Sequence, residues 1–332
     1  MRSVQYASRE EWLQARLEGY GVGASSVATI LGMSSYRTPW DLWAAHYAPE
    51  TAERKDSTDA ARGSALEVPV LEEYAAAQGL TVVHHDNELW SHERLDWARC
   101  SPDASVMQDG KRVGLAEVKT VRSGWEWRDM PDEIRVPAEV FDLPTPAYGL
   151  QCYWQLLVSG AEWVDLVVLP MGYDTAAIAG ALAEEGLQDA IRTVARALAK
   201  DLKVIRIYAD KEWLQELGGR VYEWRRRHLV EGAEPDPGSS SAAGSYYASR
   251  PKREPVEVPI DDEITTLADA LRKARILKKD ATQVEKLASN RLKQAMQDYA
   301  AVQTPRGVVK WRKHGKGMRI DISKDWLSAD NP

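Results

Sequence analysis

The sequence predicts a mixed α/β (α+β) fold, with a central mixed sheet flanked by helices and a C-terminal helical and hairpin extension. Three observations carry this prediction. Residues 101–120 read as two short strands joined by a polar bend at Asp109-Gly110. An amphipathic pattern over 147–160 then predicts a helix, and the apolar run 162–169 predicts a buried strand.

Size and composition bound the class of protein. A chain of 332 residues with net charge −7 can bury a large core, and it is too acidic for a general electrostatic coat on nucleic acid, although a local basic groove is compatible with it. Two cysteines, Cys100 and Cys152, give no disulfide framework. The sequence has no apolar run of membrane-spanning length and no signal-peptide core, so we expect no membrane association and a cytoplasmic location.

The N-terminal segment predicts two helices with a glycine-rich loop between them. Ser8 is a helix N-cap for residues 8–19, with Trp12 and Leu17 on one face and Arg16 on another side. The loop then leads to Ser25 at the start of a second short helix. A helix start of this kind attracts anions through its free N–H groups, although an ordinary N-cap is the simpler reading.

A longer helix is predicted over residues 58–78, interrupted or begun afresh near Pro69. The small residues before Glu67 would let the backbone approach the sheet and turn this carboxylate inward. The alternative is a solvated helix glutamate. Candidate strands follow at 81–85 and 88–90.

The central hairpin brings together the residues with the clearest chemistry. Asp103 starts its first strand, and the second strand alternates from Val113 to Val118 before breaking at Lys119. Glu117 and Lys119 therefore point to one face, with Val118 buried behind them. Two carboxylates can hold a divalent cation, and a lysine can steady a nucleophilic hydroxide or a phosphorane-like transition state. The alternative is a surface hairpin with a salt bridge.

The remaining elements follow from the same patterns. Residues 123–146 are rich in Trp, Pro and acidic residues and predict no regular structure, whereas 174–200 predicts helix. In the helix over 147–160, Gln151 and Gln155 share a face. We expect three parts: a catalytic domain over 1–230, a connecting segment over 231–262, and a basic helix with a hairpin over 263–332.

Several blocks carry a resemblance to a known family. Pro102-Asp103 followed by Glu117-Val118-Lys119 is the pattern of the PD-(D/E)XK nucleases, whose core is restriction-endonuclease-like. Together with WLQARLEGYGVGASSVATILG, RGSALEVPVLEEY, CSPDASV, GLAEVKT and YGLQCYWQLLVSGAEWVDLVVL, it resembles the YqaJ-type viral recombinase family, relatives of the lambda exonuclease. The resemblance covers roughly residues 8–170.

This resemblance implies roles for individual residues. Asp103, Glu117, Glu67 and the Val118 carbonyl would bind Mg²⁺, with Mn²⁺ as an alternative and two ions in the site, and Lys119 would position and activate the nucleophilic water. A terminal 5′ phosphate would be bound by Arg16, Ser25 and Ser101. Two glutamines, Gln151 and Gln155, would lie beside the metal site in a structural or catalytic role.

The resemblance also implies an activity and partners. The expected protein is a magnesium-dependent 5′→3′ exonuclease on linear double-stranded DNA, leaving 3′ overhangs for a single-strand annealing protein (RecT-like or Red-beta-like). We further expect a homo-oligomer, by resemblance a trimer, and a phage or prophage protein in the cytoplasm of a bacterial host. The rival readings are a DNA endonuclease of the same fold and a non-catalytic DNA-binding protein. The intact set of three acids and one lysine argues against the last.

Overall fold

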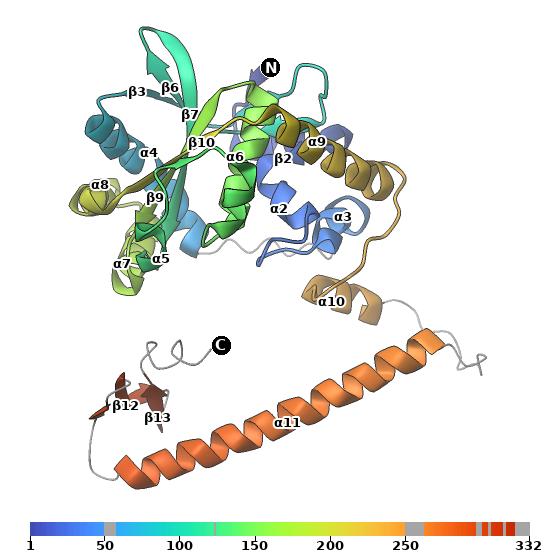
Figure 1. Ribbon diagram of the computed structural model, residues 1–332, viewed down its shortest axis with the longest axis vertical. Helices are drawn as coiled ribbons and strands as arrows, with labels where there is room; N and C mark the ends of the chain where they lie inside the picture. The colour runs from blue at the N-terminus through green and yellow to red at the C-terminus, as the bar shows by residue number, and fades with distance from the viewer. Residues whose placement is uncertain are drawn as a thin grey trace. The chain divides into compact units, whose positions relative to one another are not determined.

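The computed structural model describes residues 1–49, 58–122, 124–249, 262–296, 301–304, 307–314 and 317–322. The chain divides into two compact units, Met1–Pro251 and Lys252–Pro332, and each is described by itself (Figure 1). Among the described helices, none combines the length and the apolar character needed to cross a lipid bilayer.

The first unit is built on a six-stranded mixed sheet, as the sequence predicts. The strands lie in the order β3 (Thr81–His84), β6 (Ala104–Gln108), β7 (Lys111–Val121), β9 (Trp163–Pro170), β10 (Lys203–Tyr208) and β8 (Glu133–Ile134). Strand β7 pairs antiparallel with β6 and parallel with β9, so it lies at the centre of the sheet. The mixed α/β fold is thereby confirmed.

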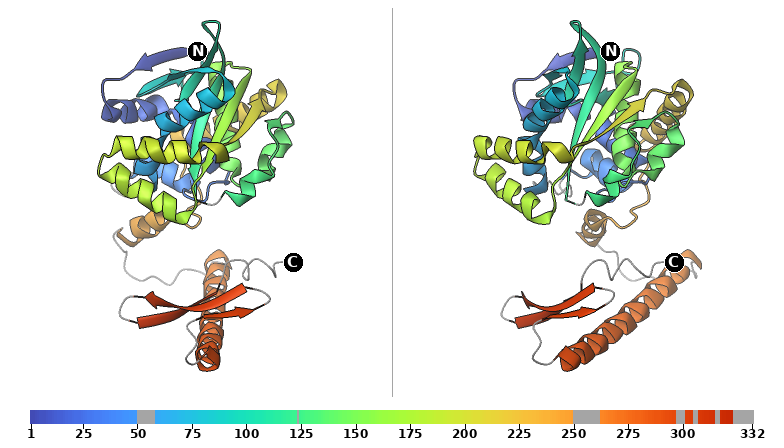
Figure 2. Two further views of the ribbon diagram at one scale, coloured as in Figure 1. Left: turned by 90° about the vertical axis from the view of Figure 1, so that its left-hand side faces the viewer. Right: turned by 60° about the vertical axis from the view of Figure 1, so that its left-hand side comes forward.

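Helices cover both faces of this sheet (Figure 2). One face packs against α4 (Thr58–Gln78), α7 (Tyr173–Glu184) and α8 (Gln188–Leu198), and the other against α6 (Pro146–Ser159) and α9 (Lys211–Arg225). Because side chains alternate along a strand, Ala116 and Val118 of β7 join the core under α4, whereas Leu115 joins the core under α6. Glu117 therefore points toward α6.

The N-terminal segment and two later strands form a second sheet. Its order is β1 (Arg2–Gln5), β4 (Glu88–Ser91), β5 (Ala98–Cys100) and β2 (Val22–Gly23). Around it lie α1 (Arg9–Leu17), the 3-10 helices η1 (Glu18–Tyr20) and η2 (Ala24–Ser26), α2 (Val27–Ile30) and α3 (Pro39–Tyr47). Ser8 accepts a hydrogen bond of 3.2 Å from the Glu11 N–H, which confirms the predicted N-cap of α1.

Helix α4 runs without a break through Pro69, so the predicted interruption there is wrong. A proline costs a helix one backbone hydrogen bond and crowds the preceding turn. Pro69 is buried, and its helix neighbours Leu66 and Val70 belong to the core that packs against the sheet. Burial of this apolar face holds the helix together.

The strands of the central hairpin also differ from the prediction. Strand β7 continues through Lys119 to Val121 because β9 pairs with it along this whole length. Asp103 lies just before β6 rather than within it. Of the two candidate strands that precede the hairpin, β3 pairs with β6, and β4 belongs to the second sheet.

Segments without a predicted regular pattern contain short elements. Between β7 and α6 lie α5 (Trp125–Arg128), β8 and the 3-10 helix η4 (Pro137–Asp142). After α9, a π-helical turn η6 (Arg226–Val230) leads to α10 (Ser241–Ser249), where Ala243 packs with Trp40 and Trp43 of α3. Part of the predicted connecting segment therefore forms a helix that packs within the first unit.

The second unit contains the predicted C-terminal helix and hairpin. They are α11 (Asp262–Met296) and an antiparallel sheet of β11 (Ala301–Thr304), β12 (Gly307–His314) and β13 (Gly317–Ile322). The proposed division of the chain at 230 and 262 stays a prediction. The Gly-Lys turn at 315–316 lies outside the described residues.

Candidate active site

Strand β7 holds Glu117 and Lys119 in an ion pair on its α6-facing side. Lys119 Nζ lies 2.5 Å from Glu117 Oε1, and their side chains are 21% and 1% exposed. Burial alone would lower the pKa of Lys119, but the Glu117 and Asp103 carboxylates raise it above its ordinary value. The two carboxylates therefore favour the charged form of Lys119, which can donate hydrogen bonds.

Asp103 is tied to the same strand through the backbone. Its Oδ2 accepts a hydrogen bond of 2.7 Å from the Val118 N–H, which lies between Glu117 and Lys119 in the chain. Burial and the nearby carboxylates of Glu117 and Glu67 raise the pKa of Asp103 well above its usual range. The predicted trio of Asp103, Glu117 and Lys119 is thus brought together around one peptide group.

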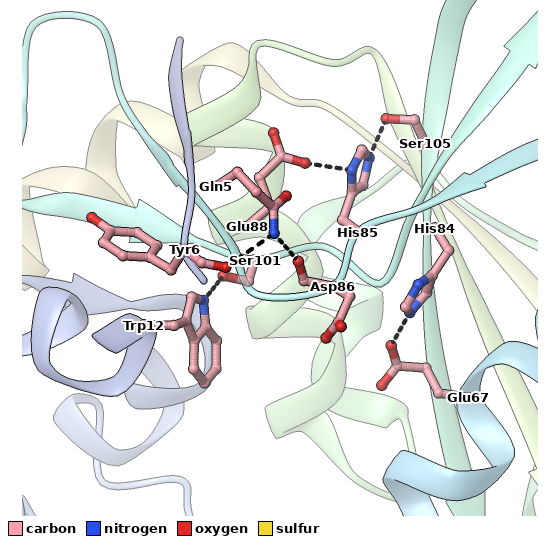
Figure 3. A network of polar contacts seen from close by, with 10 residues as sticks. All are labelled: Gln5, Tyr6, Trp12, Glu67, His84, His85, Asp86, Glu88, Ser101 and Ser105. Carbon is pink, nitrogen blue, oxygen red and sulfur yellow. Dashed lines mark hydrogen bonds and ion pairs between the residues drawn. The ribbon is translucent and has the colours of Figure 1, made fainter. Parts of the chain in front are cut away.

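Glu67 reaches the sheet from α4. Its Oε1 lies 2.8 Å from Nε2 of His84 on β3, and the two side chains are 28% and 30% exposed (Figure 3). This hydrogen bond raises the pKa of His84. Glu67 is close enough to Asp103 to raise the pKa of that carboxyl as well, so it is not the freely solvated glutamate of the alternative reading. No local pattern predicted His84 as its partner.

Gln151 and Gln155 both donate to Glu117 from α6. Gln155 Nε2 lies 2.6 Å from Oε2, and Gln151 Nε2 bonds to Oε1. The i, i+4 spacing therefore places both amides on one carboxylate, as the shared face predicts. Their observed contact is with the acid, which makes them positioning residues for Glu117.

An aromatic side chain next to Lys119 was missed. The Tyr148 ring centre lies 5.5 Å from Lys119 Nζ, and Trp127 stacks on Tyr148 with ring centres 6.0 Å apart. Tyr148 precedes Gln151 by three positions on α6, so helical spacing could have indicated it. The ring covers one side of the lysine and limits its access to water.

The three residues expected to bind a terminal phosphate are connected through Trp12. Arg16 Nη2 lies 3.1 Å from Ser25 Oγ, and its guanidinium lies over the Trp12 ring, 4.5 Å from the centroid. Trp12 Nε1 donates to Ser101 Oγ at 3.0 Å (Figure 3). Arg16 and Trp12 therefore share a face of α1, and the prediction that they lie on different sides is wrong. Residues four apart on a helix are neighbours.

Arg16 is a half-buried cation on α1. Partial burial, together with the charges of Arg37 and Arg9, lowers its pKa to about 10. Within the described part of the chain, no carboxylate lies within ion-pair distance of it. A Cβ on Gly23 would come within 2.9 Å of Arg16 Nη2, so a larger residue there would require the guanidinium to shift. A half-buried guanidinium beside a hydroxyl is a good receptor for an anion.

The acidic residues fit a divalent cation in charge and donor type. Asp103 lies near the carboxylates of Glu117 and Glu67, and carboxylate and carbonyl oxygens are the ligands that Mg²⁺ and Mn²⁺ prefer. Over the residues described, no three acidic, histidine or cysteine side chains already converge into a metal cage. Glu67 is bonded to His84, and Glu117 to the two glutamines and Lys119.

Three comparisons place these features among known proteins. A YqaJ protein of Bacillus subtilis (strain 168), described as uncharacterized, is 26% identical over 162 residues, 47% of this chain and 49% of that protein. The chain thus spans about half the length of the curated relative it matches.

Solved structures give fainter likenesses. The alkaline exonuclease LHK-Exo from Laribacter hongkongensis is 22% identical, with 67% of this chain and 93% of that chain covered, at TM-scores of 0.42 and, in its complex with dAMP, 0.44. A phage related exonuclease from Haemophilus somnus 129PT is 14% identical, with coverages of 66% and 100% and a TM-score of 0.42.

A protein-family model matches the part of the chain that contains two clusters of site residues. One cluster is the carboxylates with Lys119, and the other is Arg16 with Ser25 and Ser101. The match begins within α1, which carries Trp12 and Arg16, and it ends just beyond α6, which carries the glutamines. The sequence resemblance is confirmed over this range: residues 11–162 match the model of the YqaJ-like viral recombinase domain.

Proposed function

We propose that this protein is a magnesium-dependent 5′→3′ exonuclease that digests one strand of linear double-stranded DNA and leaves 3′ overhangs. The observation that carries the proposal is the link between the two clusters. Ser101, bonded to the Trp12 that supports Arg16, is two residues from Asp103. The Cα atoms of Ser101 and Asp103 are at most about 7 Å apart. A phosphate bound at Arg16 would therefore leave the adjoining phosphodiester bonds close to the carboxylates.

The metal ions would be held by Asp103, Glu117, Glu67 and the Val118 carbonyl. When bound, they would supply a water of lowered pKa and neutralise charge on the leaving 3′ oxygen. Protonated Lys119 would donate a hydrogen bond to the attacking water or to a phosphate oxygen. The glutamines of α6 would hold the Glu117 carboxylate in a fixed orientation.

The phosphate site formed by Arg16 and Ser25, called the Arg16 pocket, would set the direction of cutting. A 5′ phosphate bound to the guanidinium and the Ser25 hydroxyl would fix the end of the strand, and each cut would create the next 5′ phosphate. The match to a viral recombinase domain supports a role in recombination. We extend the proposal to an annealing protein, RecT-like or Red-beta-like, as the partner that uses the overhangs, to a homotrimer, and to the cytoplasm of a host bacterium.

The test uses linear duplex DNA with one 5′-phosphorylated end and one 5′-hydroxyl end, in magnesium, beside a covalently closed circle. We expect digestion from the phosphorylated end and an intact circle. Nicking of the circle would establish the endonuclease instead. Binding without cutting of either substrate would establish a non-catalytic DNA-binding protein. An Asp103→Asn variant controls for contaminating nuclease, because it keeps the side-chain shape and removes the charge.

A further inference from the structure

Basic charge is concentrated in the second unit. Residues 252–332 contain 17 Lys and Arg and 12 Asp and Glu, a net charge of +5, whereas the whole chain has −7. Residues 1–251 therefore carry −12. The acidity that argues against a general nucleic-acid coat belongs to the first unit, and the second unit has the opposite sign.

Helix α11 orders part of this charge on one face. At about 100° per residue, four cations whose side chains the structure describes fall within about 60° of its circumference: Arg272, Arg275, Lys279 and Lys286. We call them the basic stripe. All four are exposed. The stripe extends about 21 Å along the axis, from the rise of about 1.5 Å per residue.

The stripe is free of acidic side chains. The described acids of α11 between its ends, Asp269, Asp280 and Glu285, project at least about 60° away from it. No ion pair involving a stripe residue is found within the described part of the second unit. Arg272, Arg275 and Lys279 also line one shallow surface pocket, so their side chains lie on a common surface.

We propose that the basic stripe binds the phosphate backbone of duplex DNA, away from the cutting site and without regard to sequence. This inference rests on the proposed function for the identity of the substrate. Duplex DNA presents one negative charge per about 1.7 Å of its axis. An extended row of cations therefore suits the backbone of a duplex better than it suits one isolated phosphate group. Such a contact would keep the enzyme on the duplex between cuts.

The experiment measures binding to a duplex closed by a hairpin at each end, in EDTA, over a range of salt concentrations. This substrate has no 5′ terminus for the Arg16 pocket. Each phosphate contact adds about 0.9 to the slope of log K against log salt concentration. We expect R272Q/R275Q/K279Q to reduce the slope by about 2 to 3. Glutamine keeps the helix propensity near that of lysine and arginine, and circular dichroism checks the fold.

The matched control is K273Q/K278Q/R291Q, which removes the same charge from α11 outside the stripe. We expect its slope to fall by less than about 1. An unchanged slope in the stripe variant, or equal falls in both variants, would overturn the proposal. A stripe variant that keeps its slope but changes its sedimentation mass would show instead that the stripe binds the acidic unit of a second copy. Cutting of linear DNA by the wild type is scored separately, so failure of the exonuclease proposal is distinguishable.

Discussion

Gln155 and Glu117 form a buried hydrogen bond of 2.6 Å, with the amide 0% and the carboxylate 1% exposed. A carboxylate this deep needs donors on both oxygens, and Gln155, Gln151 and Lys119 supply them. The orientation of Glu117 is therefore set by two donors from α6 together with Lys119 of its own strand.

Gln155→Leu should consequently weaken magnesium binding. Loss of a residue that orients a metal ligand typically costs about 10- to 100-fold in affinity or activity. We expect the magnesium concentration for half-maximal cutting to rise by about that factor. Gln215→Leu, at an exposed glutamine on α9, is the control. An unchanged magnesium titration in Gln155→Leu would contradict the positioning role.

Arg16→Gln should abolish the preference for phosphorylated ends. A hydrogen bond to a charged group is worth about 1.5–3 kcal/mol, which corresponds to a roughly 10- to 150-fold slower cut at a 5′-phosphate end. The rate at a 5′-hydroxyl end should not change. Arg9→Gln is matched to it, because Arg9 also lies over the Trp12 ring, at 5.8 Å, from the same helix. Equal losses at both kinds of end would argue for a structural role of Arg16.

Local patterns were sufficient to predict much of this site. Strand alternation placed Glu117 and Lys119 on one face, and helix spacing placed Gln151 and Gln155 together. The partnership of Glu67 with His84 was not predictable, because it joins α4 to β3 across the tertiary structure. The same holds for Trp12 and Ser101, which are 89 positions apart in the sequence.

The errors in the fold have the same origin. Pro69 favours an interruption by its local effect on the backbone. In the folded protein, burial of the apolar face of α4 outweighs the one missing hydrogen bond, so the helix continues. The length of β7 is set by β9, a strand more than forty residues later in the chain. Partners distant in sequence decide these features, and a local pattern has no access to them.

Arg206→Ala should destabilise the first unit. Asp165 is 1% exposed and accepts two hydrogen bonds of 2.8 Å from Arg206, and a third from the Tyr74 hydroxyl. Removing the arginine leaves a buried, unpaired carboxylate, at a cost of about 3 kcal/mol after allowance for the part-exposed arginine. Urea unfolding measures this loss. Arg192→Ala, which breaks the exposed pair with Glu72, should cost less than about 1 kcal/mol. Similar losses of unfolding free energy in both variants would contradict the role of Arg206 as the partner of the buried Asp165 carboxylate.

Stability should fall in mild acid partly because of His46. Burial lowers the pKa of this histidine, on the last turn of α3, below the ordinary value of 6.5. The unfolded chain therefore binds a proton more readily than the folded one, and stability present above about pH 6.5 is lost as the pH falls through that value. His46→Gln cannot titrate, so its free energy of unfolding should decline less between pH 8 and pH 5.5 than that of the wild type. Urea titrations at both values measure the two declines, and parallel declines would show that the His46 ring is protonated as easily in the folded state as in the unfolded chain.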